Sequence, residues 1–449
     1  MTPARRTLLR GVHLLVGPQQ PPRQADVWIE EGRLGDLEAA SAGRAEPPLL
    51  AGSDPDLAAA AAAGTQVIDA RHCWLAPPLV DPHSVLEDPC RGQAETLSSL
   101  AAAAAAGGYG TVALLPWAER RRDHPEALDL RWPEPLRLLL WGSFSSGEAE
   151  NGLADHDALL RAGAVGLAAG ASLLPLPLLE RGLLLAEMGD RPVLLAPRDP
   201  ALSQQGFVRE RVEALRAGWP VDPVVSETLP LASLLALQAA RPGAALRLMN
   251  VSTAEAVAQL ECQESPPAAS VCWWHLVADS SGLDPAAIGW RVEPSLGGPR
   301  DREALIDALE RGVLSAIAVH HRPLDAEEML LTLEQRRAGV AGHGGGAVLP
   351  ALWQELVQGR RWSPHQLWQR LCWGPAAFLG LAPEELQPGS RRWILFDPRG
   401  QQPAAPLAGL RPPSLARNHP QPPAGGCGAI VASGLRGAQG WWAPGFPSS

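Results

Sequence analysis

The sequence predicts an α/β protein, a (β/α)8 TIM-like barrel with a small composite β-subdomain built from both termini. Eight short apolar runs, typical of buried parallel strands, alternate with helix-like segments between residues 75 and 320. Strand-like sequence also occurs near both ends, at residues 5–35 and 391–398. At 449 residues the chain exceeds the usual size of one domain, so we expect one large domain and a smaller one.

The apolar runs fix the expected strands, and the segments between them fix the helices. We expect barrel strands at residues 75–80, 111–116, 136–141, 164–169, 192–196, 245–251, 270–276 and 314–320. We expect helices at residues 95–106, 207–217, 226–240, 254–261 and 302–311. The N-terminal part of the β-subdomain then spans 1–74, with a low-complexity insertion at about 40–64. The barrel spans 75–384, and 385–449 supplies the rest of the subdomain, a strand at 429–431 and a Pro/Gly-rich tail.

Composition narrows the class of function. The net charge of -10 argues against nucleic acid or an acidic membrane as partner. No apolar run reaches membrane-spanning length and no signal peptide is evident, so we expect a soluble, cytoplasmic protein. The six cysteines form no CxxC pair, which favours buried thiols over disulfides or a zinc knuckle. All 38 basic residues are arginine, and the absence of lysine excludes Schiff-base and carboxylated-lysine chemistry.

Residues 75–89, LAPPLVDPHSVLEDP, have the outline of a metal-binding motif that is incomplete. An apolar strand ends in Asp81-Pro82-His83, and Val85 follows two residues after the histidine. Because strand side chains repeat every second residue, His-x-His directs two imidazoles at one ion. His-x-Val directs only one.

Several segments, in order, resemble dihydroorotase of the amidohydrolase superfamily. They are VIDARHCWLAPPLVDPHSVLEDP, ETLSSLAAAAAAGGYGTVALLP, LRLMNVSTAEAV, WHL and REALIDALERGVLSAIAVHHRPLDAEEM. The resemblance covers roughly residues 5–400 and implies a barrel of the metal-dependent hydrolase type. It also implies a place for each of that family's metal ligands and substrate-binding residues.

Most of those places hold other residues here. Where the resemblance implies a metal ligand or catalytic aspartate, the chain has Val85, Ala168 or Ala169, Ala196, Asn250 and His320. Where it implies substrate-binding residues, the chain has Glu87, Trp117 and Glu293. We expect Glu87 to place an anion beside an anionic substrate. Since a catalytic zinc needs about three protein ligands, the remaining His83 is insufficient on its own.

Four histidines fall near predicted C-terminal strand ends: His83, His275, His320 and His321. They are vestigial, hydrogen-bonded within a polar barrel mouth, or they form a relocated mononuclear metal centre. We expect vestigial histidines, and therefore no catalytic residue and no cofactor. Zinc is expected only if the histidines form a relocated metal centre. His343, in GHGGG, is expected to be exposed in a loop, and His72-Cys73 precedes the first strand at the wrong end for chemistry.

The resemblance therefore implies an inactive dihydroorotase homologue of pyrimidine biosynthesis. Inactive chains of this family act as structural or regulatory partners of aspartate carbamoyltransferase, so that enzyme is the expected partner and an oligomer the expected state. The alternative is an active divergent dihydroorotase, or a related cyclic-amide hydrolase, with a relocated metal. Binding of a small metabolite in the emptied mouth is a third possibility. Two tryptophan pairs, Trp273-Trp274 and Trp441-Trp442, are candidates for a protein interface if exposed.

Overall fold

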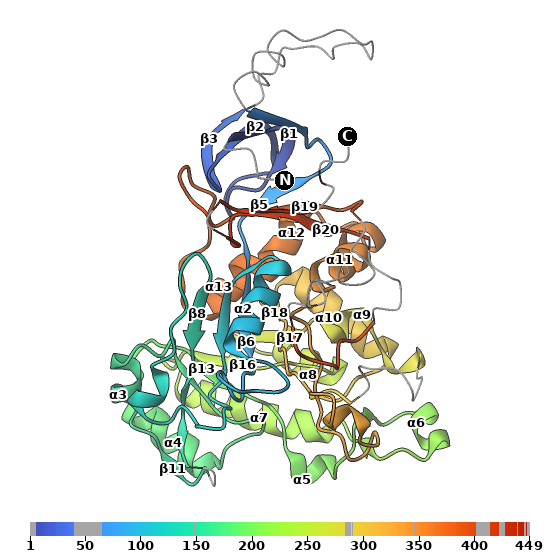
Figure 1. Ribbon diagram of the computed structural model, residues 1–449. Helices are drawn as coiled ribbons and strands as arrows, with labels where there is room; N and C mark the ends of the chain where they lie inside the picture. The colour runs from blue at the N-terminus through green and yellow to red at the C-terminus, as the bar shows by residue number, and fades with distance from the viewer. Residues whose placement is uncertain are drawn as a thin grey trace.

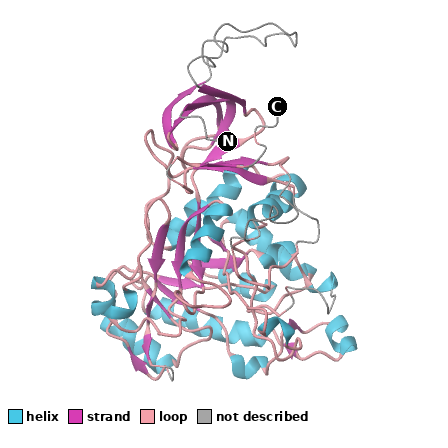
Figure 2. Cartoon of the chain, in the orientation of Figure 1, coloured by secondary structure: helices cyan, strands magenta, loops and turns pink. Residues whose placement is uncertain are grey.

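A computed structural model describes most of the chain, in two parts: a β-rich part at one end of a larger α/β body (Figures 1 and 2). The described residues are 6–39, 65–147, 150–282, 289, 291–344, 347–400, 414–421, 427–437, 439–443 and 446. The insertion expected at 40–64 and parts of the Pro/Gly-rich tail lie outside them.

The β-rich part is an eight-stranded sheet to which both ends of the chain contribute. Its order is β21-β20-β19-β5-β1-β2-β3, with β4 also pairing with β1. The strands are β1 (Arg6–Leu14), β2 (Arg23–Glu30), β3 (Arg33–Ala39), β4 (Thr65–Asp69), β5 (Trp74–Ala76), β19 (Ile394–Asp397), β20 (Ala429–Ser433) and β21 (Trp441–Trp442). N-terminal and C-terminal sequence meet where β5 pairs antiparallel with β19, Leu75 opposite Leu395.

A β-bulge at Gly11 sets the register between β1 and β2. Pairing of β1 with β2 shifts between Leu9 and Val12. Gly11 lies in this bulge at φ 64°, and its N–H donates to Asp26 Oδ1 at 2.7 Å. Glycine adopts that conformation without the steric cost of a side chain. The bulge keeps Leu9, Val12 and Leu14 in the subdomain core.

The α/β body contains two sheets of parallel strands, and within each sheet neighbouring strands follow the order of the chain. The first sheet is β6 (Leu79–Ser84), β7 (Tyr109–Leu114) and β8 (Arg137–Leu140). The second is β9 (Gly142–Ser143), β12 (Leu167–Ala168), β13 (Val193–Leu195), β16 (Leu246–Leu248), β17 (Ala268–Cys272) and β18 (Ala316–Ala318). Val165 N–H, before β12, donates to the carbonyl of Leu140, the last residue of β8, at 2.9 Å. At the other edge of each sheet, Val85 N–H, just after β6, donates to the carbonyl of His321, just after β18, at 2.8 Å. The expected combination of a parallel α/β body and a β-rich part is confirmed.

Helices follow the strands and surround them (Figure 2). They are α2 (Leu97–Ala106), α3 (His156–Arg161), α4 (Leu176–Leu185), α5 (Pro200–Ser203), α6 (Val212–Ala217), α7 (Val225–Ala240), α8 (Ala254–Glu261), α9 (Trp274–Val277), α10 (Pro299–Arg311), α11 (Val348–Leu352), α12 (Pro364–Trp368) and α13 (Gly374–Phe378). The π-helical turns η4 (Trp353–Gly359) and η5 (Gln369–Trp373) continue α11 and α12. Short 3-10 turns lie at η1 (Pro125–Leu128), η2 (Ser280–Gly282) and η3 (Glu328–Leu330), and small two-stranded sheets at β10 (Ser145–Ser146) with β11 (Gly152–Leu153) and β14 (Val208–Arg209) with β15 (Val221–Asp222).

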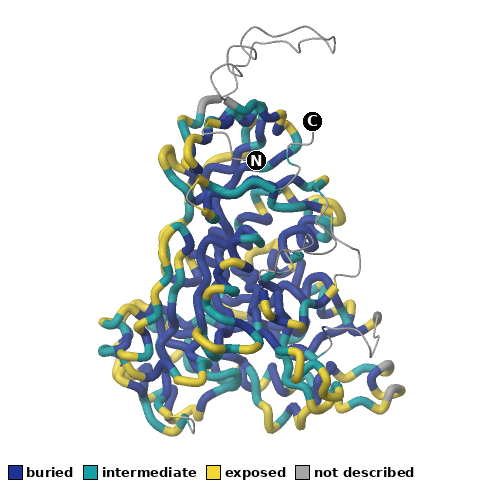
Figure 3. Tube along the Cα trace, viewed as in Figure 1, coloured by how far each residue is buried: buried dark blue, intermediate teal, exposed yellow. Residues whose placement is uncertain are grey.

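Local signals explain where several helices begin. Thr96 caps α2 by accepting from Ser99 N–H, and Thr253 caps α8 by accepting from Ala256 N–H. Every residue of β6 and β7 is buried, as expected for parallel strands covered on both faces. Figure 3 shows this burial through the interior of the body.

Two expected strands are placed differently. Residues 75–80 do not form one strand: β5 joins the subdomain, and β6 begins the parallel body at Leu79. Pro77 and Pro78 separate them, since proline has no N–H for a ladder. Residues 273–276 turn into α9 after Trp273 N–H has made its bond to Ala318 O.

The first tryptophan pair is not an exposed interface. Trp273 is 1% and Trp274 5% exposed, and the Trp274 indole N–H donates to Gly289 O at 2.8 Å. Trp441 and Trp442 are half-buried and form β21. No helix within the described residues has the length and apolar character that crossing a membrane would require.

Candidate functional site

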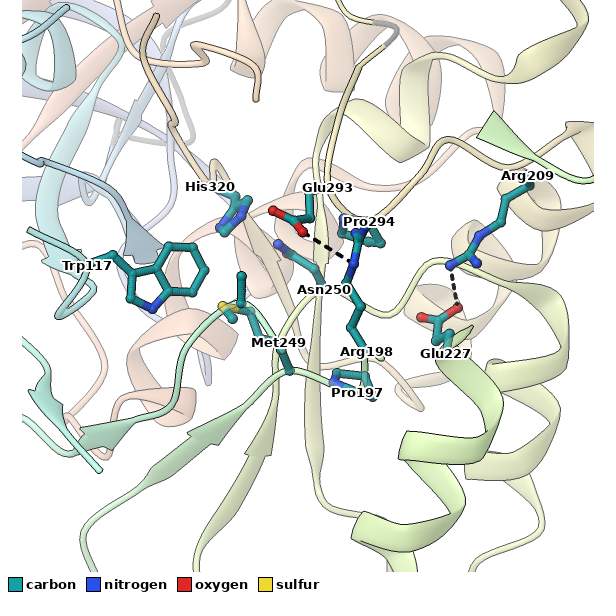
Figure 4. Close-up of a pocket in the computed structure, with 12 residues that line it drawn as sticks. Trp117, Pro197, Arg198, Arg209, Glu227, Met249, Asn250, Glu293, Pro294 and His320 are labelled. Carbon is teal, nitrogen blue, oxygen red and sulfur yellow. Dashed lines mark hydrogen bonds and ion pairs between the residues drawn. The ribbon is translucent and has the colours of Figure 1, made fainter. Parts of the chain in front are cut away.

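A small pocket lies where the parallel strands of the body end (Figure 4). Its lining residues come from segments after β7, β12, β13, β16, β17 and β18, together with Arg209 of β14 and Glu227 of α7. They are Trp117, Ala171, Ala196, Pro197, Arg198, Arg209, Glu227, Met249, Asn250, Glu293, Pro294 and His320. The centre of a water molecule can occupy only about 20 Å3 of it, which is room for a water or two. Most of the strand-end region is therefore filled by side chains.

His83 and His320 contact each other directly beside this pocket. Their Nδ1 atoms are 3.1 Å apart, and His83 Nε2 lies 2.8 Å from Ser270 Oγ. In a pair of neutral imidazoles one Nδ1 carries the proton and the other accepts it. Each Nδ1 atom is thus engaged with the other ring, and His83 Nε2 is engaged with Ser270.

Burial keeps these rings neutral. Desolvation, and then the neighbouring His320, lowers the pKa of His83 to about 3. Desolvation, and then the charge of Arg322, lowers the pKa of His320 to about 3. Both groups are therefore uncharged near neutral pH.

Asp81 organises the first strand end from a fully buried position. Its Oδ1 accepts from Val319 N–H at 3.0 Å, and its Oδ2 accepts from Ser84 Oγ at 2.5 Å. Oδ2 also lies 2.9 Å from His343 Nε2, which is 1% exposed as a residue. The expectation that His343 is exposed was wrong: a buried carboxylate needs donors, and this ring supplies one.

His321 belongs to a second group of buried polar residues. Its Nε2 lies 3.3 Å from Glu95 Oε2, and desolvation lowers its pKa to about 4 although Glu95 opposes that shift. Ser414 and Leu415, from the C-terminal part of the chain, close over this pair: Ser414 Oγ donates to Glu95 Oε2 at 2.5 Å and Leu415 N–H to Oε1 at 3.1 Å. The His321–Glu95 pair is thus covered by sequence close to the end of the chain.

His275 stands apart from the other three. Its Nε2 lies 3.1 Å from Pro294 O, and desolvation lowers its pKa to about 4. The structure brings together His83 and His320, and links His321 to His343, whose backbone N–H donates to His321 Nδ1 at 3.2 Å. His275 makes no hydrogen bond to any of them among the described residues.

Apolar side chains occupy the places where the family's other ligands are implied. Val85 is 1%, Ala168 0% and Ala196 5% exposed, and all three belong to the core of the body. Asn250 is buried at φ 56°, and its Oδ1 has no hydrogen-bond partner among the described residues. Asn250 and His320 are the two polar replacements at those places that line the pocket (Figure 4).

Glu87 and Glu293, the two glutamates at implied substrate-binding positions, have different surroundings. Glu87 lines a separate open pocket, not the strand-end pocket, and pairs with Arg337. The expected anion beside the substrate position is therefore not supplied by Glu87. Glu293 does line the strand-end pocket, where it contacts both Arg198 and Arg322. Burial alone raises its pKa, but the two arginines outweigh burial and hold it below the usual value.

Sequence reasoning missed the buried arginine network at the edge of the pocket. Arg209 is 2% exposed; its Nη1 lies 3.2 Å from Asp222 Oδ2 and its Nη2 3.4 Å from Glu227 Oε2. Desolvation raises the pKa of Glu227 despite Arg209. Nothing in the spacing of these residues signals that they meet, because β14, β15 and α7 are brought together only by the tertiary fold.

The donor sets at the strand ends can be compared with those a metal requires. Within the described ranges, one group of three His, Cys, Asp or Glu side chains has ligand atoms close enough for an ion: His72, Cys73 and Asp397. That group lies in the β-rich part. The four candidate histidines do not form such a group with each other.

Comparisons with known proteins place this geometry in context. The chain is 34% identical over 375 residues to a "Probable dihydroorotase-like protein" of Synechocystis sp., covering 75% of this chain and 83% of that one. It is 30% identical over 366 residues to a "Dihydroorotase" of Syntrophobacter fumaroxidans, covering 80% and 79%. The fold is similar to that of L-hydantoinase (dihydropyrimidinase) from Arthrobacter aurescens, with a TM-score of 0.68, 18% identity and coverage of 95% and 94%. No family model matches the chain.

Proposed function

The chain belongs to the dihydroorotase-like family of the amidohydrolase superfamily, and from that premise we propose that it is a catalytically inactive dihydroorotase homologue. In this proposal it serves pyrimidine biosynthesis as a structural or regulatory partner of aspartate carbamoyltransferase. In the same proposal the parallel strands of the body, with β8 and β9 counted as one, close into a (β/α)8 barrel. The barrel domain is proposed to span about 75–384, with β5 at its start belonging to the composite β-subdomain of 1–74 and 385–449. We expect an oligomeric, cytoplasmic protein.

One observation carries the proposal: the only histidine retained in the family's first metal motif is bonded to another histidine. The His83 and His320 Nδ1 atoms are 3.1 Å apart, and His83 Nε2 is held by Ser270. Around them Val85, Ala168 and Ala196 offer no donor atom. Catalytic zinc needs about three protein ligands, so the residues present do not fit the zinc centre of a working dihydroorotase.

The packing of side chains in the strand-end region also supports the proposal. Metal ligands that remained in the mouth without a metal would be buried and poorly paired. Each of them would destabilise the folded state by roughly several kcal/mol. Here three buried acids have partners: Asp81 with His343, Glu95 with Ser414, and Glu293 with two arginines. These acids therefore do not need an ion to balance their charge.

An assay with dihydroorotate and with carbamoyl aspartate tests the loss of activity. We expect no turnover above the uncatalysed rate in either direction, with or without added zinc, because no group activates a water. The matched variant is His83→Ala. Turnover that this variant abolishes would establish the alternative, a divergent hydrolase with a relocated metal. Zinc content alone does not decide, since His72, Cys73 and Asp397 offer a second place for an ion.

Co-expression with the aspartate carbamoyltransferase of the same organism tests the partner. We expect the two chains to co-elute in a fixed ratio on size exclusion at micromolar concentration. The His83→Ala variant should co-elute equally well, because a scaffold does not use the mouth for chemistry. Separate elution of the two folded proteins, with unchanged transcarbamoylase activity on mixing, would contradict the partner role and leave the loss of catalysis standing.

A further inference from the structure

The β-subdomain contains a cluster of three metal-ligating side chains outside the barrel mouth. His72 and Cys73 occupy the turn between β4 and β5, and Asp397 ends β19. Their ligand atoms all lie within 4.8 Å of one another. The cluster thus joins residues near the start of the chain to one near its end, across the β5–β19 pairing of Trp74 with Phe396.

We propose that His72, Cys73 and Asp397 form a zinc site that links the N-terminal and C-terminal halves of the β-subdomain. Thiolate, imidazole and carboxylate are the three ligand types that Zn²⁺ takes in proteins. Two ligands about 2.0–2.1 Å from zinc at the tetrahedral angle lie about 3.3 Å apart, and such a separation fits a metal site only where a third ligand atom is close, as in this group of the described residues. His72 Nε2 and Asp397 Oδ2 are 3.3 Å apart.

The surroundings leave the required atoms available. Asp397 Oδ1 accepts from Arg399 N–H at 2.9 Å, which leaves Oδ2 directed at His72. The Cys73 backbone is fixed on both sides, because its N–H donates to Ala70 O at 2.8 Å and its carbonyl accepts from His13 N–H at 3.0 Å. A fixed backbone holds the thiol in place before the ion arrives.

The site combines a buried thiol with a histidine that solvent can reach, as a metal site requires. Cys73 is fully buried, whereas the His72 side chain is 28% exposed and gives an ion a route from solvent. The fourth position would hold a water on that open side.

Cobalt titration of the full-length, chelator-treated protein tests the site. Co²⁺ bound to a thiolate absorbs in the near ultraviolet by charge transfer, and we expect one such equivalent per chain, displaced by Zn²⁺. Cys73→Ser should abolish the band, and His72→Asn or Asp397→Asn should weaken binding at least tenfold. Cys90→Ser, at an exposed cysteine, and His83→Ala should leave the band unchanged.

The outcomes are separable from those of the proposed function. No charge-transfer band in the wild type, or a band that survives Cys73→Ser, would overturn the site whatever the enzyme assay shows. If Cys73→Ser fails to fold, the partly exposed His72→Asn decides: unchanged cobalt affinity in that variant also overturns it. Loss of the band in His83→Ala would instead move the metal to the barrel mouth.

Discussion

Lowering the pH from 7 to 5 is expected to reduce the free energy of unfolding by roughly 5–8 kcal/mol, because four buried histidines must stay neutral in the folded state. Desolvation lowers the pKa of His83 and His320 to about 3, and of His275 and His321 to about 4, from 6.5. Between pH 6.5 and these values the unfolded chain binds protons that the folded chain does not. Stability is therefore complete above pH 6.5 and is lost as the pH falls toward 4. Since most proteins are stable by about 5–15 kcal/mol, unfolding near pH 5 is the expected result.

The number of protons taken up on unfolding reports this loss of stability. Calorimetric unfolding in buffers of different ionisation enthalpy measures that number. We expect an uptake of about three protons per chain at pH 6, where the protein is still folded, and about one fewer in His320→Asn, whose amide can still donate to His83. His124→Asn serves as the control, because that side chain is 65% exposed. A melting temperature that does not change between pH 7 and 5 would rule out the neutral buried array. Glu95 and Glu293, with lowered pKa values, add their own loss only below about pH 4.5.

Arg209→Met is expected to cost about 3–5 kcal/mol of folding free energy, because it leaves two buried carboxylates without their cation. Asp222 is 1% and Glu227 2% exposed, and the guanidinium also donates to Ser226 Oγ and Ser252 Oγ, both at 3.0 Å. Urea denaturation at pH 7 measures the loss. The deficit should shrink at lower pH, since burial already raises the pKa of Glu227 and the variant lets it be protonated more readily.

Two further variants separate the network from simple loss of packing. The triple change Arg209→Met, Asp222→Asn and Glu227→Gln removes every charge, so it should recover most of the lost stability. Arg161→Met breaks an ion pair with Asp157 in which the arginine is 80% exposed, and it should change stability by at most about 1 kcal/mol. Equal losses for Arg209→Met and Arg161→Met would show that the buried charges are not coupled as described.

Much of the fold was predictable because its signals are local. The expected helix at residues 254–261 matches α8, where Thr253 supplies a cap and apolar residues recur at helical spacing. The expectation of a single strand at residues 75–80 was wrong, because the apolar run that predicts it continues across Pro77 and Pro78, where β5 and β6 separate. In the strand-like run that ends at residue 276, the turn into α9 depends on tertiary bonds of Trp273 and Trp274 that no local pattern carries.

The candidate site was less predictable than the fold. The sequence identified His83 and His320 as belonging to the strand ends, but not that their rings would meet. It placed His343 in a loop and missed its contact with Asp81, 262 residues away along the chain. Glycine-rich sequence argues for a loop but does not say whether the loop folds inward. Partners that far apart are chosen by packing, which a single sequence does not record.

The sheet shared by both ends of the chain has a consequence for synthesis. Strand β5 ends at Ala76, but its neighbour β19 begins only at Ile394. At about 5–20 residues per second, a ribosome needs tens of seconds to supply that neighbour. Throughout this interval one edge of β5 has no partner, and exposed edges invite pairing with other chains. We therefore expect the nascent N-terminal strands to depend on a chaperone, or on slow docking after release, before the protein reaches the sheet described above.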